Sequence, residues 1–493
     1  MQEHAVYERA RLSRDARFDG QFYTGVRTTG IYCRPICPAN PPKSENVDYY
    51  PSAAAASEAG LRPCLRCRPE CAPGTPAWHG TSTTVRRGLR LIAGGALDEG
   101  SIEQLAERLG VTSRHLRRLF KTHLGASPLA VAHTQRLHFA KRLIDETALP
   151  MAEIAMASGY GSVRRFNDAF RNTYGRSPRD LRRHSGNAEL SADLATLSVR
   201  LPYRKPFDWQ QLLAFAQGRA IPGVESVADS SYRRTVRVNG NVGIIEVRDV
   251  PAASSLELRV HGVQTIDLFP LVQKVREMFD LDAPVDAIRK VLVRDPFLKR
   301  CLKSRTVVRV PGTWDAWELT VRAILGQQVS VKAATTLSGR IVARYGAPLD
   351  KPTSERFAAI GLSHTFPEPA DVVRAHFNDL GIVGTRIEAI RSVARALLDG
   401  TFSFDAAQCP EEFCSRIVKL RGIGDWTAQY VAMRALKNPD AFPSSDLGLL
   451  RAFDGDAKQR MKPREILERA EAWRPWRAYA ALLLWNSDAN SGG

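Results

Sequence analysis

Four cysteines in two close pairs lie near the start of the chain. Cys33 and Cys37 form the first pair, with three residues between them. Cys64 and Cys67 form the second pair, with two residues between them, and 26 residues separate the pairs. Each short loop can present two sulfurs at about 2.3 Å from one ion, so the spacing predicts a tetrahedral four-thiolate zinc site. Few apolar residues surround the pairs, and a metal would therefore supply much of the folding free energy of this small domain. Cys71 lies just beyond the cluster as an alternative ligand, but its Glu70 neighbour and its position outside the second cysteine pair favour a passenger role.

The rest of the chain supports metal or thiol chemistry rather than disulfides. No stretch of eighteen apolar residues occurs, and the N-terminal segment MQEHAVYERARLSRDAR has no apolar signal core. We therefore expect a soluble, cytoplasmic protein without a membrane contact. In that reducing compartment the eight cysteines are not expected to form a disulfide framework.

Residues 14–69 resemble the N-terminal domain of the bacterial adaptive-response regulator family Ada. The resemblance rests on RDARFDGQFYTGVRTTGIYCRPICPAN and LRPCLRCRP. It implies that Cys33 is both a zinc ligand and the acceptor of a methyl group from DNA methylphosphotriesters, in a stoichiometric and irreversible reaction. The Cys33 thiolate is the nucleophile in such a reaction. A zinc site that only holds the fold is the alternative. Four arginines near the cluster are expected to hold the phosphate backbone: Arg27, Arg34, Arg66 and Arg68.

Methylation of Cys33 has a predicted electrostatic consequence. Four thiolates on Zn²⁺ carry a net charge of about −2, and methylation removes one negative charge, which should raise affinity for DNA. The family's second methyl-transfer motif, Pro-Cys-His-Arg, is absent from the sequence. Repair of O6-alkylguanine is therefore not predicted.

The positive charge of the chain is unevenly distributed. The 493 residues suggest three or four domains, and the net charge of +18 favours a polyanionic partner. Residues 80–186 hold 18 Lys and Arg against 9 Asp and Glu, which is half of the excess. Turn-forming stretches at 72–84 and 184–194 bracket this basic segment as predicted linkers, and the tail from Asn486 is expected to fray.

Two similar segments inside the basic region predict tandem helix-turn-helix units. They are SIEQLAERLGVTSRHLRRLF and PMAEIAMASGYGSVRRFNDAF, each with a glycine between two amphipathic helices. Residues 86–183, including FNDAFRNTYGRSPRDLRR, resemble the AraC-type DNA-binding domain, which implies promoter binding. The second helix of each unit carries basic residues suited to a major groove: Arg114, Arg117, Arg118, Arg164 and Arg165.

The remaining chain contains a β-rich and a helical part. Residues 195–290 alternate apolar and polar residues in RRTVRVNG, VGIIEVRD and SLELRVHG, which predicts an antiparallel sheet with flanking helices. From about residue 312 the pattern becomes helical. LRGIGDWTAQYVAMRAL, beginning at Leu420, predicts a helix-hairpin-helix, because Gly422 and Gly424 permit a tight turn and let backbone N–H groups approach a DNA phosphate.

Residues 195–485 resemble AlkA-type 3-methyladenine DNA glycosylase II. The matching blocks include FDWQQLLAFAQGRAIPGVESV, VRAILGQQVSV, RGIGDWTAQYVAMRAL and WRPWRAYAALLLW. The resemblance implies that Asp446 is the catalytic aspartate, and it implies an aromatic base pocket made of Phe215, Trp426, Tyr430 and Trp485.

These residue types suit the chemistry of alkylated bases. A cationic alkylated base gains cation–π attraction from aromatic rings once it is flipped out of the duplex. Because that base is already a good leaving group, Asp446 need only stabilise the oxocarbenium-like sugar and orient or deprotonate water. The lyase branch of this superfamily has a Schiff-base lysine where this chain has Trp426, so we predict hydrolysis without strand cleavage.

Two positions depart from the family pattern. Gln328 stands where a leucine wedge is expected, and Leu447 replaces the aromatic residue after the catalytic aspartate. Gln328 can still fill the vacated stack and hydrogen-bond the orphaned base.

We therefore predict a multidomain protein, mainly α with α+β parts. A small zinc α/β domain (1–78) precedes an all-α tandem helix-turn-helix domain (84–184), an antiparallel α+β domain (195–300) and an all-α helix-hairpin-helix glycosylase domain (301–486). The predicted function combines a methyl-activated transcriptional regulator with a monofunctional glycosylase. In the alternative, the glycosylase-like half only grips DNA. The expected cofactor is Zn²⁺, and the expected partners of the monomer are alkylated DNA, promoter DNA and RNA polymerase at the bacterial nucleoid.

Overall fold

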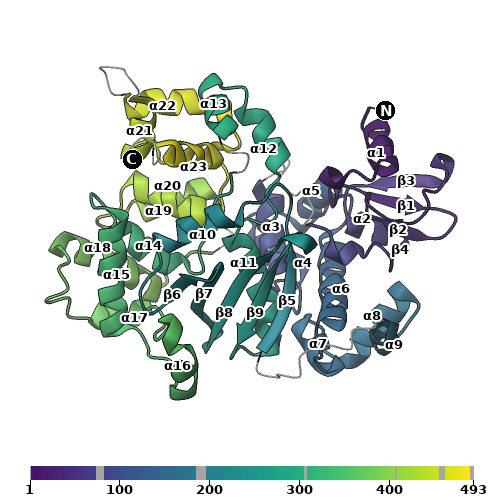
Figure 1. Cartoon of the computed structure of the whole chain (residues 1–493), viewed down its shortest axis with the longest axis horizontal. Coiled ribbons are helices and arrows are strands. Elements are labelled where there is room, and N and C mark those ends of the chain that lie inside the picture. Colours follow the sequence, from purple (N-terminus) through teal and green to yellow (C-terminus); the bar gives the residue numbers. More distant parts are fainter. Residues whose placement is uncertain are drawn as a thin grey trace. The chain divides into compact units, whose positions relative to one another are not determined.

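The computed structural model describes residues 2–73, 83–184, 196–304, 308–405, 408–454 and 461–488. Most of both predicted linkers and the end of the tail lie outside these residues. The chain divides into two compact units. Figure 1 labels their helices and strands in chain order. The first unit consists of residues 1–205, 250–276 and 281–283, and the second of residues 206–249, 277–280 and 284–493. Within the described ranges, no helix has both the length and the apolar character needed to cross a bilayer.

The first unit begins with a small four-stranded sheet of order β3-β1-β2-β4. β1 pairs antiparallel with β2 and with β3, whereas β2 and β4 run parallel. Helix α2 begins with four buried alanines, whose small side chains let it pack closely against Tyr23 and Tyr32 of the sheet. The elements are α1 (Gln2–Leu12), β1 (Tyr23–Val26), β2 (Ile31–Cys33), β3 (Val47–Tyr50), α2 (Ala53–Glu58) and β4 (Arg62–Pro63).

Seven helices follow and confirm the tandem helix-turn-helix prediction. They are α3 (Thr83–Ala93), α4 (Ile102–Arg108), α5 (Ser113–Leu124), α6 (Pro128–Glu146), α7 (Met151–Ala157), α8 (Val163–Tyr174) and α9 (Pro178–His184). The repeat is regular, since α4 and α7 have seven residues each and α5 and α8 have twelve each. Thr112 and Ser162 cap the second helix of each unit by accepting a backbone N–H three residues later. Gly110 and Gly159 take positive φ in the two turns.

The first unit also holds two paired strands. β5 (Thr196–Pro202) and β9 (Ser255–His261) run antiparallel. Their inward residues, among them Val199, Leu201 and Leu258, are fully buried, and in β9 they follow the alternation that the sequence predicted. Helix α11 (Leu268–Met278) follows β9.

The second unit contains an antiparallel meander. β6 (Glu225–Ala228) pairs with β7 (Ser231–Val238), which pairs with β8 (Asn241–Val250). Helix α10 (Trp209–Gln217) packs against β6 and β7.

Helices make up the rest of the second unit. α14, almost wholly buried, packs against α15, α18 and α20, and α23 packs against α13 and α21 (Figure 1). The helices are α12 (Val285–Leu292), α13 (Pro296–Ser304), α14 (Ala316–Leu325), α15 (Val331–Tyr345), α16 (Lys351–Phe357), α17 (Pro369–Arg374), α18 (Gly384–Leu398), α19 (Pro410–Ile417), α20 (Asp425–Arg434), α21 (Leu447–Asp454), α22 (Pro463–Ala470) and α23 (Arg477–Asp488).

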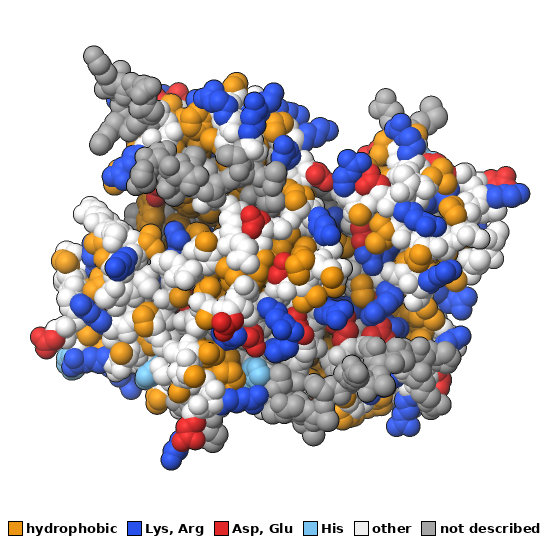
Figure 2. All heavy atoms as spheres, in the orientation of Figure 1, with side chains coloured by type: hydrophobic (Ala, Val, Ile, Leu, Met, Phe, Trp, Pro, Cys, Tyr) orange, Lys and Arg blue, Asp and Glu red, His pale blue; other side chains and the backbone are white. Residues whose placement is uncertain are grey.

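This architecture confirms the predicted fold class, with its zinc-type sheet domain, tandem helix-turn-helix, antiparallel strands and helical glycosylase-type domain. The four domain boundaries stay predictions. On the face shown in Figure 2, blue Lys and Arg side chains are widespread and red acidic ones are fewer, in keeping with the net charge of +18.

Candidate functional site

The two cysteine pairs meet at one edge of the small sheet. Cys33 ends β2, and Cys64 directly follows β4. Because the parallel register aligns Tyr32 with Pro63, Cys33 and Cys64 leave the sheet side by side. Tight turns then bring Cys37 and Cys67 back to the same place, and Cys71 is not one of this group.

The sulfur geometry fits one tetrahedral metal ion. The four Sγ atoms all lie within 4.8 Å of one another. Zn–S bonds of about 2.3 Å require sulfurs separated by about 3.8 Å, so small side-chain adjustments suffice. Hydrogen bonding with the Cys33 thiol, and then with Cys67, lowers the pKa of Cys37 to about 7 against opposing effects of Cys64 and burial. The same cluster raises the pKa of the Cys33 thiol through hydrogen bonds with Cys37 and Cys64, so protons are retained by part of the quartet until a metal displaces them.

Arg34, one of the four arginines predicted to hold the phosphate backbone, is bound by other groups of the protein itself. The Arg34 guanidinium forms a bidentate ion pair with Asp19, with Nε at 2.8 Å, and donates to the Cys67 carbonyl at 3.1 Å. The backbone N–H of Arg34 donates to Cys67 Sγ at 3.3 Å. In this arrangement Arg34 ties the two cysteine loops together, and its contact with DNA stays a prediction.

The two second helices present their basic side chains to solvent. The five predicted DNA contacts are exposed: Arg114, Arg117, Arg118, Arg164 and Arg165. On the opposite side of these helices, Phe120 and Phe166 are fully buried. Arg117 also forms an exposed ion pair with Glu103 at 3.2 Å. Such a pair contributes little in water and can be exchanged for a DNA phosphate.

Asp446 lies at the start of α21, where four N–H groups converge on its carboxylate. Oδ2 accepts from Trp426 Nε1 at 2.6 Å, and Oδ1 accepts from Trp485 Nε1 at 2.7 Å. Oδ1 also accepts the backbone N–H groups of Gly448 at 2.8 Å and Leu449 at 3.1 Å. An ionised carboxylate, which only accepts hydrogen bonds, matches this set of donors. The carboxylate is thereby fixed in orientation although it is only partly buried.

Three of the four predicted pocket aromatics surround this carboxylate. Trp426 and Tyr430, one turn apart on α20, stack with ring centroids 5.2 Å apart and planes at 9°. Trp485 from α23 lies 6.3 Å from Tyr430. Phe215 from α10 lies farther along, where Arg434 contacts both its ring and the Tyr430 ring, at 5.1 Å and 5.3 Å from the centroids.

The hairpin between α19 and α20 has the predicted backbone. Gly422 takes φ +81°, whereas a Cβ at Gly424 would meet nothing within 4 Å. Gln328 is exposed and takes a left-handed φ of +57°. Gln327 Nε2 donates to the Gly422 carbonyl at 3.2 Å and to Thr427 Oγ1 at 3.3 Å, so the loop that carries Gln328 is tied to the hairpin.

Sequence reasoning missed two arginines that line this region. Arg219 lies over the Phe215 ring at 3.9 Å, and Arg434 Nη1 donates to the Tyr430 hydroxyl at 2.5 Å. Both follow an aromatic pocket residue by four positions: Arg434 shares a face of α20 with Tyr430, whereas Arg219 lies two residues beyond the end of α10. That spacing was an available signal.

Four family models match consecutive parts of the chain. They are the metal binding domain of Ada (7–70), a helix-turn-helix domain (105–184), the AlkA N-terminal domain (198–315) and the HhH-GPD superfamily base excision DNA repair protein (321–478). The first match spans all four clustered cysteines, which form a zinc site. The last match makes the C-terminal part a DNA glycosylase of that superfamily.

Related proteins cover both halves. A probable bifunctional transcriptional activator/DNA repair enzyme AlkA of Mycobacterium tuberculosis is 40% identical over 97% of this chain and 95% of its own length. DNA-3-methyladenine glycosylase 2 of Escherichia coli is 32% identical over 58% of this chain and 96% of its own length. The solved structure of 3-methyladenine DNA-glycosylase from Archaeoglobus fulgidus covers 60% of this chain and 99% of its own, with TM-score 0.50 and 20% identity, and shares the fold.

Proposed function

The chain belongs to the family of bifunctional transcriptional activators and DNA repair enzymes of the AlkA type, and on that premise we propose two linked activities. The C-terminal half excises alkylated purines such as 3-methyladenine. The N-terminal half accepts a methyl group from DNA methylphosphotriesters on Cys33 and then activates transcription.

Asp446 carries the glycosylase proposal, because its carboxylate is held by two indole N–H groups at the aromatic pocket. A fixed negative charge stabilises the positive charge that develops on the sugar as the glycosidic bond breaks. The partly exposed carboxylate is also placed to orient a water or take its proton. The departing base takes the bonding electron pair, and water adds to the sugar carbon.

The product is proposed to be an abasic site without strand cleavage. An amine would be needed to form a Schiff base with the opened sugar. The position that holds a Schiff-base lysine in the lyase branch is occupied by Trp426 in this chain, and the indole N–H of Trp426 already donates to Asp446. Hydrolysis by water is therefore the step that these side chains support.

An excision assay with Asp446→Asn tests the glycosylase. An asparagine NH₂ at the Oδ2 position would face the Trp426 N–H, donor against donor, and the negative charge would be lost. We expect single-turnover release of 3-methyladenine from duplex DNA to fall about a hundredfold or more. Asp425→Asn removes an exposed carboxylate nearby and should leave the rate unchanged.

Release by the Asp446→Asn protein at the parental rate would remove Asp446 from the mechanism. Strand breaks that appear before any alkali treatment would contradict the proposal of hydrolysis without lyase chemistry. If the unaltered chain binds alkylated DNA and releases no base, the alternative holds, in which this half only grips DNA.

The methyl-transfer step is a displacement at carbon. The Cys33 sulfur attacks the methyl group, an S–C bond forms, and the C–O bond to the phosphotriester breaks with its electron pair on the phosphate oxygen. Zinc, when bound by the four cysteines, keeps the sulfur as thiolate. Arg34 fixes the turn after Cys33 through Asp19 and the Cys67 carbonyl.

Mass spectrometry of the peptide spanning residues 31–37 tests this step. After incubation with methylated DNA, the peptide should gain one methyl group on Cys33. Cys71→Ala should gain the same methyl group, because this half-buried cysteine lies outside the quartet. An unmodified peptide from zinc-loaded protein would reduce the zinc site to a structural role.

The regulatory proposal concerns promoter DNA and RNA polymerase. Methylation removes one negative charge from the zinc cluster, so affinity for promoter DNA should rise. We propose that the protein acts on these partners as a monomer at the bacterial nucleoid. Equal promoter affinity before and after methylation, at fixed salt, would count against this switch, and light scattering tests the monomer.

A further inference from the structure

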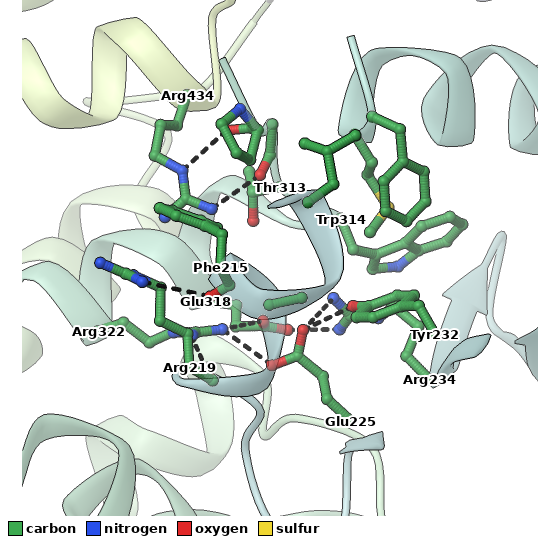
Figure 3. A pocket seen from close by; sticks show the side chains of 16 residues that line it. Phe215, Arg219, Glu225, Tyr232, Arg234, Thr313, Trp314, Glu318, Arg322 and Arg434 are labelled. Carbon is green, nitrogen blue, oxygen red and sulfur yellow. Dashed lines mark hydrogen bonds and ion pairs between the residues drawn. The ribbon is translucent and has the colours of Figure 1, made fainter. Parts of the chain in front are cut away.

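A cavity beside the aromatic pocket contains more positive than negative charge. Its volume is about 50 Å³, and all its lining residues belong to the second unit (Figure 3). Four guanidinium groups and two carboxylates line it: Arg219, Arg234, Arg322, Arg434, Glu225 and Glu318. Burying a charge costs free energy unless a partner of opposite charge compensates it, and this cavity has two more positive than negative charges in its lining.

Two of the four arginines are neutralised by the carboxylates. Glu318 pairs with Arg234 at 2.7 Å and with Arg322 at 3.4 Å. Glu225 pairs with Arg322 at 3.0 Å and with Arg234 at 3.8 Å. Tyr232 donates its hydroxyl to Glu225 at 2.6 Å and completes this closed network.

Arg219 and Arg434 have only neutral partners. Arg434 donates to the Pro311 and Gly312 carbonyls, each at 2.9 Å, and to the Tyr430 hydroxyl. Arg219 donates to the Phe215 carbonyl at 3.2 Å. Among the described residues, no carboxylate lies within 4.0 Å of either guanidinium.

The two guanidiniums lie over faces of two of the predicted pocket aromatics, Phe215 and Tyr430. Arg219 lies over Phe215 at 3.9 Å from the ring centroid, and Arg434 also lies near this ring (Figure 3). Arg434 lies over Tyr430 as well. The protein's own guanidinium groups therefore already make cation–π contacts with these two rings. At Tyr430 the two guanidiniums add a positive contribution to the potential that a flipped base meets, on the side of the pocket away from the Asp446 carboxylate's indole partners.

The titration of Tyr430 reflects the same potential. Burial by itself raises the pKa of this phenol, yet Arg434, Arg219 and Arg322 together outweigh burial and lower it. The pKa of Arg219 is also lowered, first by burial and then by Arg434 and Arg322, with Tyr430 opposing. Both shifts oppose an additional positive charge at this place.

We propose that Arg219 and Arg434 determine specificity by charge: they weaken the binding of cationic bases and so favour uncharged damaged bases in relative terms. This inference rests on the proposed glycosylase function. Cationic alkylpurines are better leaving groups, and the arginines offset part of that chemical advantage. The excision rates of charged and uncharged damaged bases should therefore differ less than the reactivities of these bases as leaving groups.

The test compares two lesions in one duplex sequence, 7-methylguanine as the cationic base and hypoxanthine as the uncharged base. Arg219 is the better site to change, because Arg434 also anchors the Pro311 and Gly312 carbonyls. Arg219→Met removes the charge and keeps a long apolar stem, whereas Arg219→Lys keeps the charge. We expect Arg219→Met to raise the ratio of 7-methylguanine to hypoxanthine excision at least about tenfold, which is the effect of one charge about 12 Å away at an effective dielectric constant of about 20.

A spectroscopic measurement separates charge from altered packing. Ultraviolet titration should show Tyr430 ionising at higher pH in Arg219→Met than in the parent or in Arg219→Lys, with Tyr430→Phe identifying the signal. An unchanged excision ratio in Arg219→Met, or an equal change in Arg219→Lys, would overturn the inference while leaving the glycosylase intact. If the unaltered chain releases neither base, the proposed function fails and the inference fails with it.

Discussion

Gly422 and Gly424 lie two residues apart in the hairpin, yet alanine should act differently at each. At Gly422 the φ of +81° is left-handed, and a Cβ would lie 2.5 Å from the Ala389 Cβ. A left-handed alanine costs about 1–2 kcal/mol, and the overlap costs about 1–3 kcal/mol, so Gly422→Ala should lose about 2–5 kcal/mol of stability. At Gly424 nothing lies within 4 Å, and alanine at this N-cap costs about 1 kcal/mol or less.

The two substitutions should affect DNA affinity in the opposite order, with the larger loss for Gly424→Ala. A methyl group at Gly424 points into the open space that a phosphate would enter, so Gly424→Ala should lose a hydrogen bond to a charged group. That loss is about 1.5–3 kcal/mol, or roughly tenfold to a hundredfold in Kd.

Calorimetry of the full chain and anisotropy with a duplex measure the two effects. For a unit of this size, 1 kcal/mol shifts Tm by about 2–4 °C, so Gly422→Ala should lower the relevant Tm by roughly 4–20 °C. The zinc site belongs to the first unit, so the unfolding transition that persists after zinc chelation is assigned to the second unit. A shift for Gly422→Ala no larger than that for Gly424→Ala would refute the packing argument. Unchanged DNA affinity of Gly424→Ala at fixed salt would refute the phosphate role.

Three further outcomes are expected. Trp485→Phe keeps a ring but removes the N–H that Asp446 accepts at 2.7 Å, so single-turnover excision should fall about tenfold or more, and an unchanged rate would show that this hydrogen bond is dispensable. Removing zinc with a chelator should unfold the segment 7–70 and abolish methyl transfer, while base excision continues, because the Asp446 site lies in the other unit. Burial lowers the pKa of His138 to about 4, so the unfolded state binds the extra proton first and stability falls as pH drops from 6.5 toward 4, by up to about 3 kcal/mol. His138→Gln should flatten this dependence in denaturation series at matched zinc content.

Short-range patterns were sufficient for much of the fold. The cysteine spacing led directly to the quartet, because the two loops that carry it are only a few residues long. The caps Thr112 and Ser162 also depend on a short-range signal, because a hydroxyl side chain before an amphipathic run satisfies a local N–H group. The strands β7 and β8 followed from their alternating apolar and polar residues, although three consecutive residues of each are buried, so both faces of these strands are covered there.

Local patterns were insufficient where function depends on partners far apart in sequence. Arg34 has the charge expected of a phosphate ligand, and only the folded sheet shows that Asp19 engages it. Gln328 was predicted as a wedge, but its attachment to the hairpin through Gln327 becomes visible only in three dimensions.

The sequence alone determined the domain types and the zinc ligands, because short motifs encode local geometry and chemistry, and its resemblance to AlkA-type glycosylases predicted the aspartate and aromatic residues of the site. The tertiary structure decided which partners hold those groups and which charges surround them. It aimed the indoles of Trp426 and Trp485 at Asp446 from two helices, and it left Arg219 and Arg434 without a carboxylate among the described residues. Electrostatic potential at a site sums over neighbours from many segments, and no single stretch of sequence contains that sum.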